Sequence, residues 1–266
     1  MAKLAIVKSF TLPLAEVSSL ALRTIEGKPQ ICAIADDSSF IVTAKVSAAG
    51  DLGDFERFDM AGIVGADAKN EWEGVAADGE GTLFLLQETG RVLVVAPALD
   101  RLLGIIELPP RTGNSGAEGL LLLRNGHVLA LNEKNPALLV EYGPPDTVSE
   151  GVHPGLFEPA KFHLPSAESS AFVELKSWSV DLEDVSDIAV HDGHLYVVSD
   201  ASKCIAEIES RLSSDGGEAP IVARWKLPRE TKKAEGLLVL EGRTPIVGSD
   251  KPDEGEPNVY QLEPLG

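Results

Sequence analysis

One short pattern occurs five times along the chain, and this repetition constrains the fold more than any other feature. Each copy is a small or acidic residue followed by a short apolar run, which is typical of a β-strand. The copies are VSSLALR at 17–23, WEGVAAD at 72–78, AEGLLLL at 117–123, VSDIAVH at 185–191 and AEGLLVL at 234–240. Three of them contain Glu-Gly, at Glu73, Glu118 and Glu235, whereas Ser18 and Ser186 replace the glutamate in the other two.

A second polar position follows each of these starts at a nearly constant distance, fourteen or fifteen residues in four copies and nineteen in the first. These second positions are Asp37, Glu88, Glu133, Asp200 and Asp250. Gly, Asn and Asp residues between the two positions supply the backbone conformations of tight hairpin turns. Each copy is therefore predicted to form two antiparallel strands joined by a turn.

Further short apolar strands follow the hairpins, and the five starts are spaced 55, 45, 68 and 49 residues apart. Five four-stranded units of this size predict an all-β fold, a five-bladed β-propeller that occupies residues 1–266 as one domain. A six-bladed ring is the alternative. The last unit is one strand short, and the opening segment LAIVKSFTLP at 4–13 has no unit of its own. We expect this N-terminal strand to complete the last blade and close the ring.

The pattern resembles the SdiA-regulated (YjiK-like) family of β-propellers. The resemblance rests on the strand starts VSSLA, WEGVA, AEGLL, VSDIA and KAEGL, and on LNEKNP and VVSDAS at the ends of the second strands. It covers most of the chain and implies a propeller fold more than a defined activity. Similar propellers include calcium-dependent esterases, lactonases and phytases, so the resemblance allows an enzyme of that kind.

The hairpin geometry gathers the polar positions at one mouth of the ring, because the second strand returns to the face where the first began. Two carboxylates about 7 Å apart repel by roughly 2.4 kcal/mol at an effective dielectric constant of about 20. A bound divalent cation, neighbouring lysines or protonation of one acid can offset this repulsion. The lysines near the acids are Lys69, Lys134, Lys232, Lys233 and Lys251.

We expect Glu73, Glu118 and Glu235 to bind the metal, with Ca²⁺ preferred, Mg²⁺ as the alternative, and no metal as the remaining case. Glu133 and Asp200 are the candidate catalytic bases. The candidate residues for binding a small-molecule substrate are Asp37, Glu88, Asn132, Ser186, Asp187 and Asp250. A structural interpretation of Glu-Gly competes with these roles, since the glutamates could accept hydrogen bonds that join neighbouring blades.

Two functions remain open on this basis. A cation at the mouth could polarise an ester, lactone or phosphate oxygen for hydrolysis. Alternatively, the propeller is a non-catalytic scaffold that binds a small ligand or a protein partner. The sequence contains no GxSxG, HExxH, P-loop or GxGxxG motif, which argues against serine hydrolases of the elbow type, zincins and common nucleotide enzymes.

Charge and composition restrict the partners. The formal net charge is −19, from 42 acidic and 23 basic residues, which disfavours nucleic acid and anionic membranes as partners. The first residues lack the apolar core of a signal peptide, and no apolar run has the length of a membrane helix. These features predict a cytoplasmic protein.

The distance from Tyr142 to Ser186 is 44 residues, about 20 more than the corresponding distance in the other comparable units, and this insertion contains VHPGLFEPAKFHL at 152–164. Placed between the third and fourth blades, it would emerge on the same face as the acidic positions. We therefore expect it to cover part of the acidic mouth as a lid.

Overall fold

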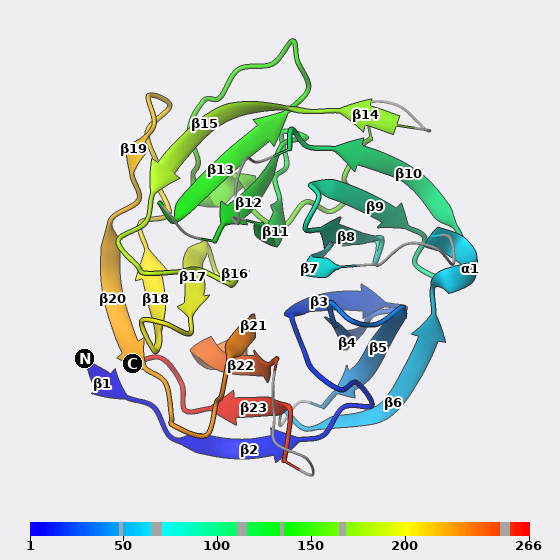
Figure 1. Cartoon of the computed structure of the whole chain (residues 1–266), viewed down its shortest axis with the longest axis vertical. Helices are drawn as coiled ribbons and strands as arrows, with labels where there is room; N and C mark the ends of the chain where they lie inside the picture. The colour runs from blue at the N-terminus through cyan, green and yellow to red at the C-terminus, as the bar shows by residue number, and fades with distance from the viewer. Residues whose placement is uncertain (48–49, 65–70, 111–115, 134–135, 165–168, 251–255) are drawn as a thin grey trace.

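A computed structural model describes residues 1–47, 50–64, 71–110, 116–133, 136–164, 169–250 and 256–266. The strands of these residues form five sheets arranged around a central axis (Figure 1). The prediction of an all-β, five-bladed propeller is confirmed. Among the described residues the helices are α1 (Ala61–Val64) and the single 3-10 turns η1 (Pro154–Leu156) and η2 (Glu241–Arg243), and none is long and apolar enough to cross a membrane.

Each blade begins with a strand at the axis, and the following strands lie progressively farther out. Blade 1 consists of β3 (Ser19–Ile25), β4 (Lys28–Ile34), β5 (Phe40–Val46) and β6 (Leu52–Asp59). Blade 2 consists of β7 (Trp72–Ala77), β8 (Leu83–Gln87), β9 (Arg91–Val95), β10 (Leu102–Glu107) and β14 (Ser169–Ala171). Blade 3 consists of β11 (Ala117–Leu122), β12 (Val128–Asn132), β13 (Leu138–Gly143), β15 (Val173–Ser179) and β19 (Gly217–Glu218).

The last two blades include the N-terminal strands. Blade 4 consists of β16 (Asp187–His191), β17 (His194–Ser199), β18 (Cys204–Ile208), β20 (Ile221–Lys226) and β1 (Ala2–Lys3). Blade 5 consists of β21 (Ala234–Leu240), β22 (Thr244–Ser249), β23 (Val259–Leu262) and β2 (Ile6–Phe10). The expected closure is confirmed, because β2 pairs antiparallel with β23 at the outer edge of blade 5. The pairing of β1 with β20 was not anticipated, and it ties the chain start to blade 4 as well.

The hydrophobic core lies between the blades rather than at the axis. Five clusters of buried apolar side chains each join two consecutive blades. Middle strands such as β8, β9 and β12 have buried apolar residues on both faces, because a blade packs against a neighbour on either side. The short apolar runs seen in the sequence follow from this two-sided burial.

The Glu-Gly pairs mark the positions where the inner strands depart from regular pairing. The register between the first two strands shifts at Glu-Gly in blades 2, 3 and 5, whereas blades 1 and 4, which lack the pair, keep one register. Gly119 adopts a φ of +51°, and a Cβ on Gly74 would lie 3.0 Å from the backbone carbon of Gly119. A glycine in a β-bulge therefore lets two inner strands approach closely at the axis.

The lid prediction is wrong. The insertion connects β13 to β15 within blade 3, and β13 ends on the face opposite the acidic positions. The backbone N–H of Gly79 donates to the carbonyl of Pro159 (2.9 Å), and that of Arg124 donates to Leu156 (2.7 Å). Both contacts involve turns between first and second strands, which lie at the far end of the channel from Glu73 and Glu118. The error arose because Val173–Ser179 is the fourth strand of blade 3, so the insertion falls inside a blade rather than between two blades.

Candidate functional site at the acidic mouth

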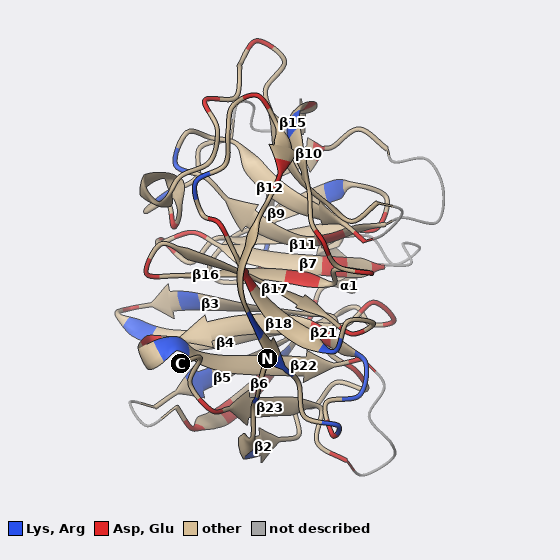
Figure 2. Ribbon diagram, turned by 90° about the vertical axis from the view of Figure 1, so that its left-hand side faces the viewer, with Lys and Arg blue, Asp and Glu red and all other residues tan. Residues whose placement is uncertain are grey.

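Three glutamates of the repeated pattern lie where inner strands begin. Glu73, Glu118 and Glu235 belong to β7, β11 and β21, and each is half-buried. Figure 2 views the ring from the side, with acidic segments coloured along β7 and β11 near the axis. The Glu73 and Glu118 side chains are hydrogen-bonded to each other. The structure therefore brings together glutamates that are 45 residues apart in the sequence.

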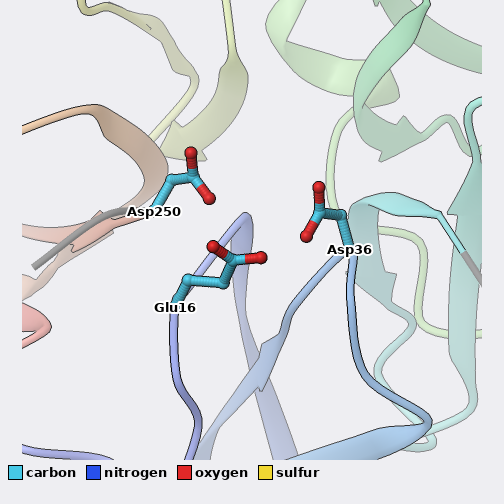
Figure 3. Close-up of side chains that lie close together, drawn as sticks. All are labelled: Glu16, Asp36 and Asp250. Atoms are coloured by element: carbon cyan, nitrogen blue, oxygen red, sulfur yellow. The ribbon is translucent and has the colours of Figure 1, made fainter.

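A second, tighter group of acids occupies the side of the mouth formed by blades 5 and 1. Glu16 precedes β3, Asp36 follows β4, and Asp250 follows β22, and their side chains point toward one another (Figure 3). One carboxylate oxygen from each lies within 4.8 Å of the others. Oδ1 of Asp36 is buried and has no hydrogen-bond partner among the residues that the structure describes. Of this group, sequence reasoning identified Asp250 alone.

Asp36 lies at the mouth, whereas the neighbouring Asp37, which was expected there, does not join the acidic group. The Asp37 side chain is exposed, whereas Asp36 is half-buried and its backbone N–H donates to Oγ of Ser18 (3.0 Å). Glu16 lies before the first repeat, so the repeat offered no signal for it. Its position two residues ahead of Ser18 is the feature that could have indicated it, because that segment leads into the axis.

Burial and mutual repulsion hold protons on the mouth acids. Burial, followed by hydrogen bonds to Asp36 and Asp250, raises the pKa of Glu16 to about 10. Burial and the charges of neighbouring acids raise the pKa of Glu73 to about 7 and that of Glu235 to about 8. The same causes raise the pKa of Glu118 well above its usual range. The mouth thus resists carrying its full negative charge.

Lys233 partly neutralises the mouth. Its ammonium group donates to Oδ2 of Asp250 and lies 3.4 Å from Oε1 of Glu235. Burial lowers the pKa of Lys233, but the contacts with these two carboxylates outweigh it and raise the pKa overall. Lys232 instead contacts Glu256 at 3.1 Å, and the other neighbouring lysines, Lys69, Lys134 and Lys251, lie outside the described residues. Ion pairing therefore offsets part of the acidic charge on the blade 5 side.

The two candidate bases have different surroundings. Oδ1 of Asp200 accepts hydrogen bonds from Nζ of Lys203 (2.5 Å) and from the N–H of Ala234 (3.1 Å), so it joins blade 4 to the start of β21. Glu133 is half-buried, and its charge contributes to the raised pKa of Glu118. Glu133 is therefore part of the mouth, whereas Asp200 is held by the protein itself.

The other residues proposed for substrate binding are divided between the mouth and the interior. Glu88 is exposed, and its charge raises the pKa of both Glu73 and Glu118, so it belongs to the mouth. Asn132 is buried, and its side-chain amide donates to the carbonyl of Pro136 (2.9 Å).

Asp187 lies beneath the mouth, on the axis, and is 1% exposed. Its Oδ2 accepts hydrogen bonds from Oγ of Ser19 (3.0 Å) and from the N–H groups of Leu20 (3.3 Å) and Leu237 (2.8 Å), while Oδ1 accepts from the N–H of Ile188 (2.9 Å). One carboxyl group thus connects blades 1, 4 and 5. Ser186, its neighbour, is half-buried and pairs through its backbone with Val198.

Ser19 and Gly119 connect this group of hydrogen bonds around Asp187 to the two remaining blades. Oγ of Ser19 accepts a hydrogen bond from the N–H of Val75 in blade 2 (3.1 Å), and a Cβ on Gly119 of blade 3 would lie 2.9 Å from the N atom of Ile188. Hydrogen bonds at the repeated strand starts therefore do join neighbouring blades, but Asp187 and Ser19 form them rather than the glutamates. Burial raises the pKa of Asp187 to about 8, against the opposing effect of its hydrogen bonds.

In the presence of a chelator, we expect the unfolding free energy to fall as the pH rises from about 5 to about 8. The pKa values of Glu73 (about 7) and Glu235 (about 8) in the folded protein lie above the ordinary 4.5. The folded state therefore keeps protons that the unfolded state has released in this window, and stability is lost as the pH passes through the folded-state values. Urea unfolding at pH 5.5, 7 and 8.5 measures the slope.

Replacing both Glu73 and Glu235 by glutamine should make this dependence less steep, and Glu16, Glu118 and Asp187, whose pKa values are also raised, account for the remainder. The pKa values of the exposed Asp51, Asp54 and Asp59 are lowered, so these groups change the unfolding free energy only below about pH 4. They therefore do not affect the slope between pH 5.5 and 8.5. A parent protein that becomes more stable between pH 5.5 and 8.5 would contradict the expectation.

A closed ring of blades with polar residues converging at one mouth defines this chain as a β-propeller with an acidic axial site. The family model for SdiA-regulated proteins matches residues 102–242, just over half of the chain. The chain belongs to the SdiA-regulated family. No curated protein matches the sequence.

Solved structures provide further likenesses at low sequence identity. A glutaminyl cyclase from Myxococcus xanthus is 13% identical and has a TM-score of 0.53, covering 98% of this chain and 95% of that one. A PQQ-bound aldose sugar dehydrogenase from Streptomyces coelicolor is 10% identical with a TM-score of 0.47, covering 98% of each chain. At 13% identity, the likeness to the cyclase shows a shared fold alone. The TM-score of 0.47 for the dehydrogenase is too low to support a structural conclusion.

Proposed function

We propose that the acidic mouth binds a divalent cation, with Ca²⁺ preferred over Mg²⁺, and that a small-molecule ligand binds beside it. The observation that carries the proposal is the convergence of Glu16, Asp36 and Asp250 within 4.8 Å, with a buried Asp36 oxygen that has no hydrogen-bond partner within the described part of the chain. A cation supplies the missing partner and removes the repulsion among the three carboxylates. Ca²⁺ accepts six to eight oxygen ligands in a flexible geometry, which suits carboxylates from three separate segments.

The repeated glutamates have a supporting role in this proposal. Glu73 lies near enough to raise the pKa of Glu235, and Asp250 raises the pKa of both, so these two glutamates can complete the oxygen shell directly or through water. The side chain of Glu118 is hydrogen-bonded to Glu73 and would position the Glu73 carboxylate. The proposed metal ligands therefore differ from those expected from the sequence, and they lie on the side of the mouth formed by blades 5 and 1.

Calcium is expected to raise the melting temperature of the protein. Binding at a hundred times the dissociation constant stabilises the folded state by roughly 2.7 kcal/mol. For a chain of this size that corresponds to an increase of roughly 5–10 °C. Calorimetry in chelator and in millimolar Ca²⁺ measures the difference, and a second titration with Mg²⁺ tests the preference between the two ions.

Asp36→Asn should abolish most of this increase, because it removes the charge of a proposed ligand and keeps its shape. Asp192→Asn is the matched control, since Asp192 is an exposed acid in the turn between β16 and β17, on the opposite face. Glu118→Gln separates the remaining interpretations. It should weaken the calcium effect if Glu118 supports the site, or stabilise the chelated protein if the acids only repel. It should destabilise the protein equally in both conditions if Glu118 is purely structural. The absence of a calcium-dependent shift in the parent protein would end the calcium proposal.

We extend the proposal to hydrolysis of an ester, lactone or phosphate, with Glu133 as the base. A cation at the mouth would polarise the substrate oxygen, and a carboxylate at its edge would activate water. Glu133 is better placed than Asp200, whose oxygen already accepts two hydrogen bonds. A panel of aryl esters, lactones and phosphate monoesters, assayed with Ca²⁺, tests the activity. Glu133→Gln should abolish turnover and keep the calcium-dependent stabilisation. Calcium binding without turnover of any of these compounds would favour the non-catalytic ligand-binding scaffold.

A further inference from the structure

A cavity lies at the end of the ring axis opposite the acidic mouth. Its volume is about 700 Å³, within the range of cavities that bind drug-sized molecules. The distal halves of the five inner strands, β3, β7, β11, β16 and β21, form its wall, and residues 157–163 of the blade 3 insertion add one side. The apolar runs of the repeated pattern line this cavity, and none of the proposed cation ligands Glu16, Asp36 and Asp250 does.

The cavity is separated from the mouth by the hydrogen bonds of Asp187. Leu20, Ile188 and Leu237 line the cavity, and their N–H groups donate to the Asp187 carboxyl group. This carboxyl group therefore stands between the cavity and the acids above it. A molecule that enters from the far face binds independently of any cation at the mouth.

The insertion forms a packed wall rather than a loose loop. The N–H of Phe162 donates to Oδ2 of Asp78 (3.1 Å), and a Cβ on Gly79 would lie 2.9 Å from the carbonyl oxygen of Ala160. Phe157 is 2% exposed. Because these contacts fix the insertion against two blades, the cavity is formed before any ligand arrives, which reduces the entropic cost of binding.

The chemistry of the lining favours a neutral ligand. Leu22 is 39% exposed, and Leu121 and Val190 are half-buried, so apolar side chains remain available to a ligand. The charged residues of the lining balance in formal charge, in a chain whose net charge is −19: Arg23, Arg124 and Lys161 against Asp78, Glu158 and Glu241.

Several of these charges are already engaged with the protein. Nζ of Lys161 lies 2.8 Å from Oε2 of Glu80, and Nε of Arg124 donates to the carbonyl of Phe157 (2.7 Å). The lining therefore offers apolar contact without an excess charge of either sign to attract an ionic group.

We propose that this cavity is a binding site for a neutral, largely apolar small molecule, distinct from the acidic mouth. Burial of apolar ligand surface against Leu22, Leu121 and Val190 provides the affinity. The unpaired edges of the inner strands offer backbone N–H and C=O groups for a few directed hydrogen bonds.

Fluorescence titration with the neutral probe N-phenyl-1-naphthylamine tests the proposal. We expect saturable binding with one site per chain, and at least tenfold weaker binding by Leu22→Glu, which places a charge in the wall. Thr24→Arg is a second variant at an exposed lining position, in case Leu22→Glu fails to fold. Val222→Glu is the matched control, because Val222 is 57% exposed on β20, away from the channel.

Three results would overturn the proposal: no saturable binding, equal weakening by the lining and control variants, or tighter binding of the anionic probe anilinonaphthalene sulfonate than of the neutral one. Binding that is unchanged by chelator and by Asp36→Asn would support a site separate from the mouth. Binding that is lost in chelator would contradict that separation.

Discussion

Asp187→Ala is expected to destabilise the protein by at least about 3 kcal/mol. The substitution removes the acceptor for the N–H groups of Leu20, Ile188 and Leu237 and for the hydroxyl of Ser19, at a position that is 1% exposed. A buried polar group without a partner costs about 1–3 kcal/mol, and three or four are created at once. Since typical domains are stable by about 5–15 kcal/mol, the loss approaches the threshold for folding. Urea unfolding measures it.

Asp187→Asn is the informative companion variant. Its amide oxygen can replace Oδ2, which accepts three of the four hydrogen bonds, so we expect a smaller loss than for alanine. An alanine variant within about 1 kcal/mol of the parent would show that water or a rearranged strand replaces the carboxyl group. The role assigned to Asp187 as the hub of the ring would then be wrong.

Deletion of residues 1–12 should lower the melting temperature by roughly 10 °C or more. It removes β2 from blade 5, together with Leu4 (4% exposed) and Leu12 (1% exposed). Burial of two leucines contributes about 3–6 kcal/mol, and each kcal/mol corresponds to roughly 2–4 °C for a chain of this size. The deletion also breaks the hydrogen bonds that join Leu12 to the side chain of Asn258 (2.8 and 3.1 Å).

Deletion of residues 1–3 provides the control, because it removes the exposed strand β1 and leaves the closure by β2 intact. We expect a small effect from this shorter deletion, measured by the same thermal unfolding experiment. Equal melting temperatures for the parent protein and the longer deletion would contradict the idea that β2 holds the ring closed.

The fold was predictable because a propeller repeats one local unit. The spacing from Glu73 to Glu88 or from Glu235 to Asp250 depends only on a hairpin, which short-range sequence signals describe well. The missing strand of blade 5 could be found by counting, since the ring must close. The insertion was misplaced because the outer strand Val173–Ser179 has little periodic signal: its residues are mostly exposed or half-buried.

The location of the candidate site could be predicted from the sequence, but not all of the residues that form it. The repeat placed Glu73, Glu118 and Glu235 at one mouth, but it could not identify Glu16, which lies ahead of the first copy. It also could not distinguish Asp36 from Asp37, because both lie in the turn after β4, where the strand repeat does not specify the side-chain directions. The choice between those two depends on how the end of β4 meets Ser18 in space.

The sequence by itself determined the number of blades, the closure by the N-terminal strand and the acidic character of one mouth. These features follow from patterns within about 15 residues, repeated around the ring. Only the tertiary structure decided that Asp187 joins three blades, that Glu16, Asp36 and Asp250 meet, and that the insertion forms the wall of a separate cavity. Each of these depends on contacts between residues far apart in the chain, and a linear sequence carries no local signal for such contacts.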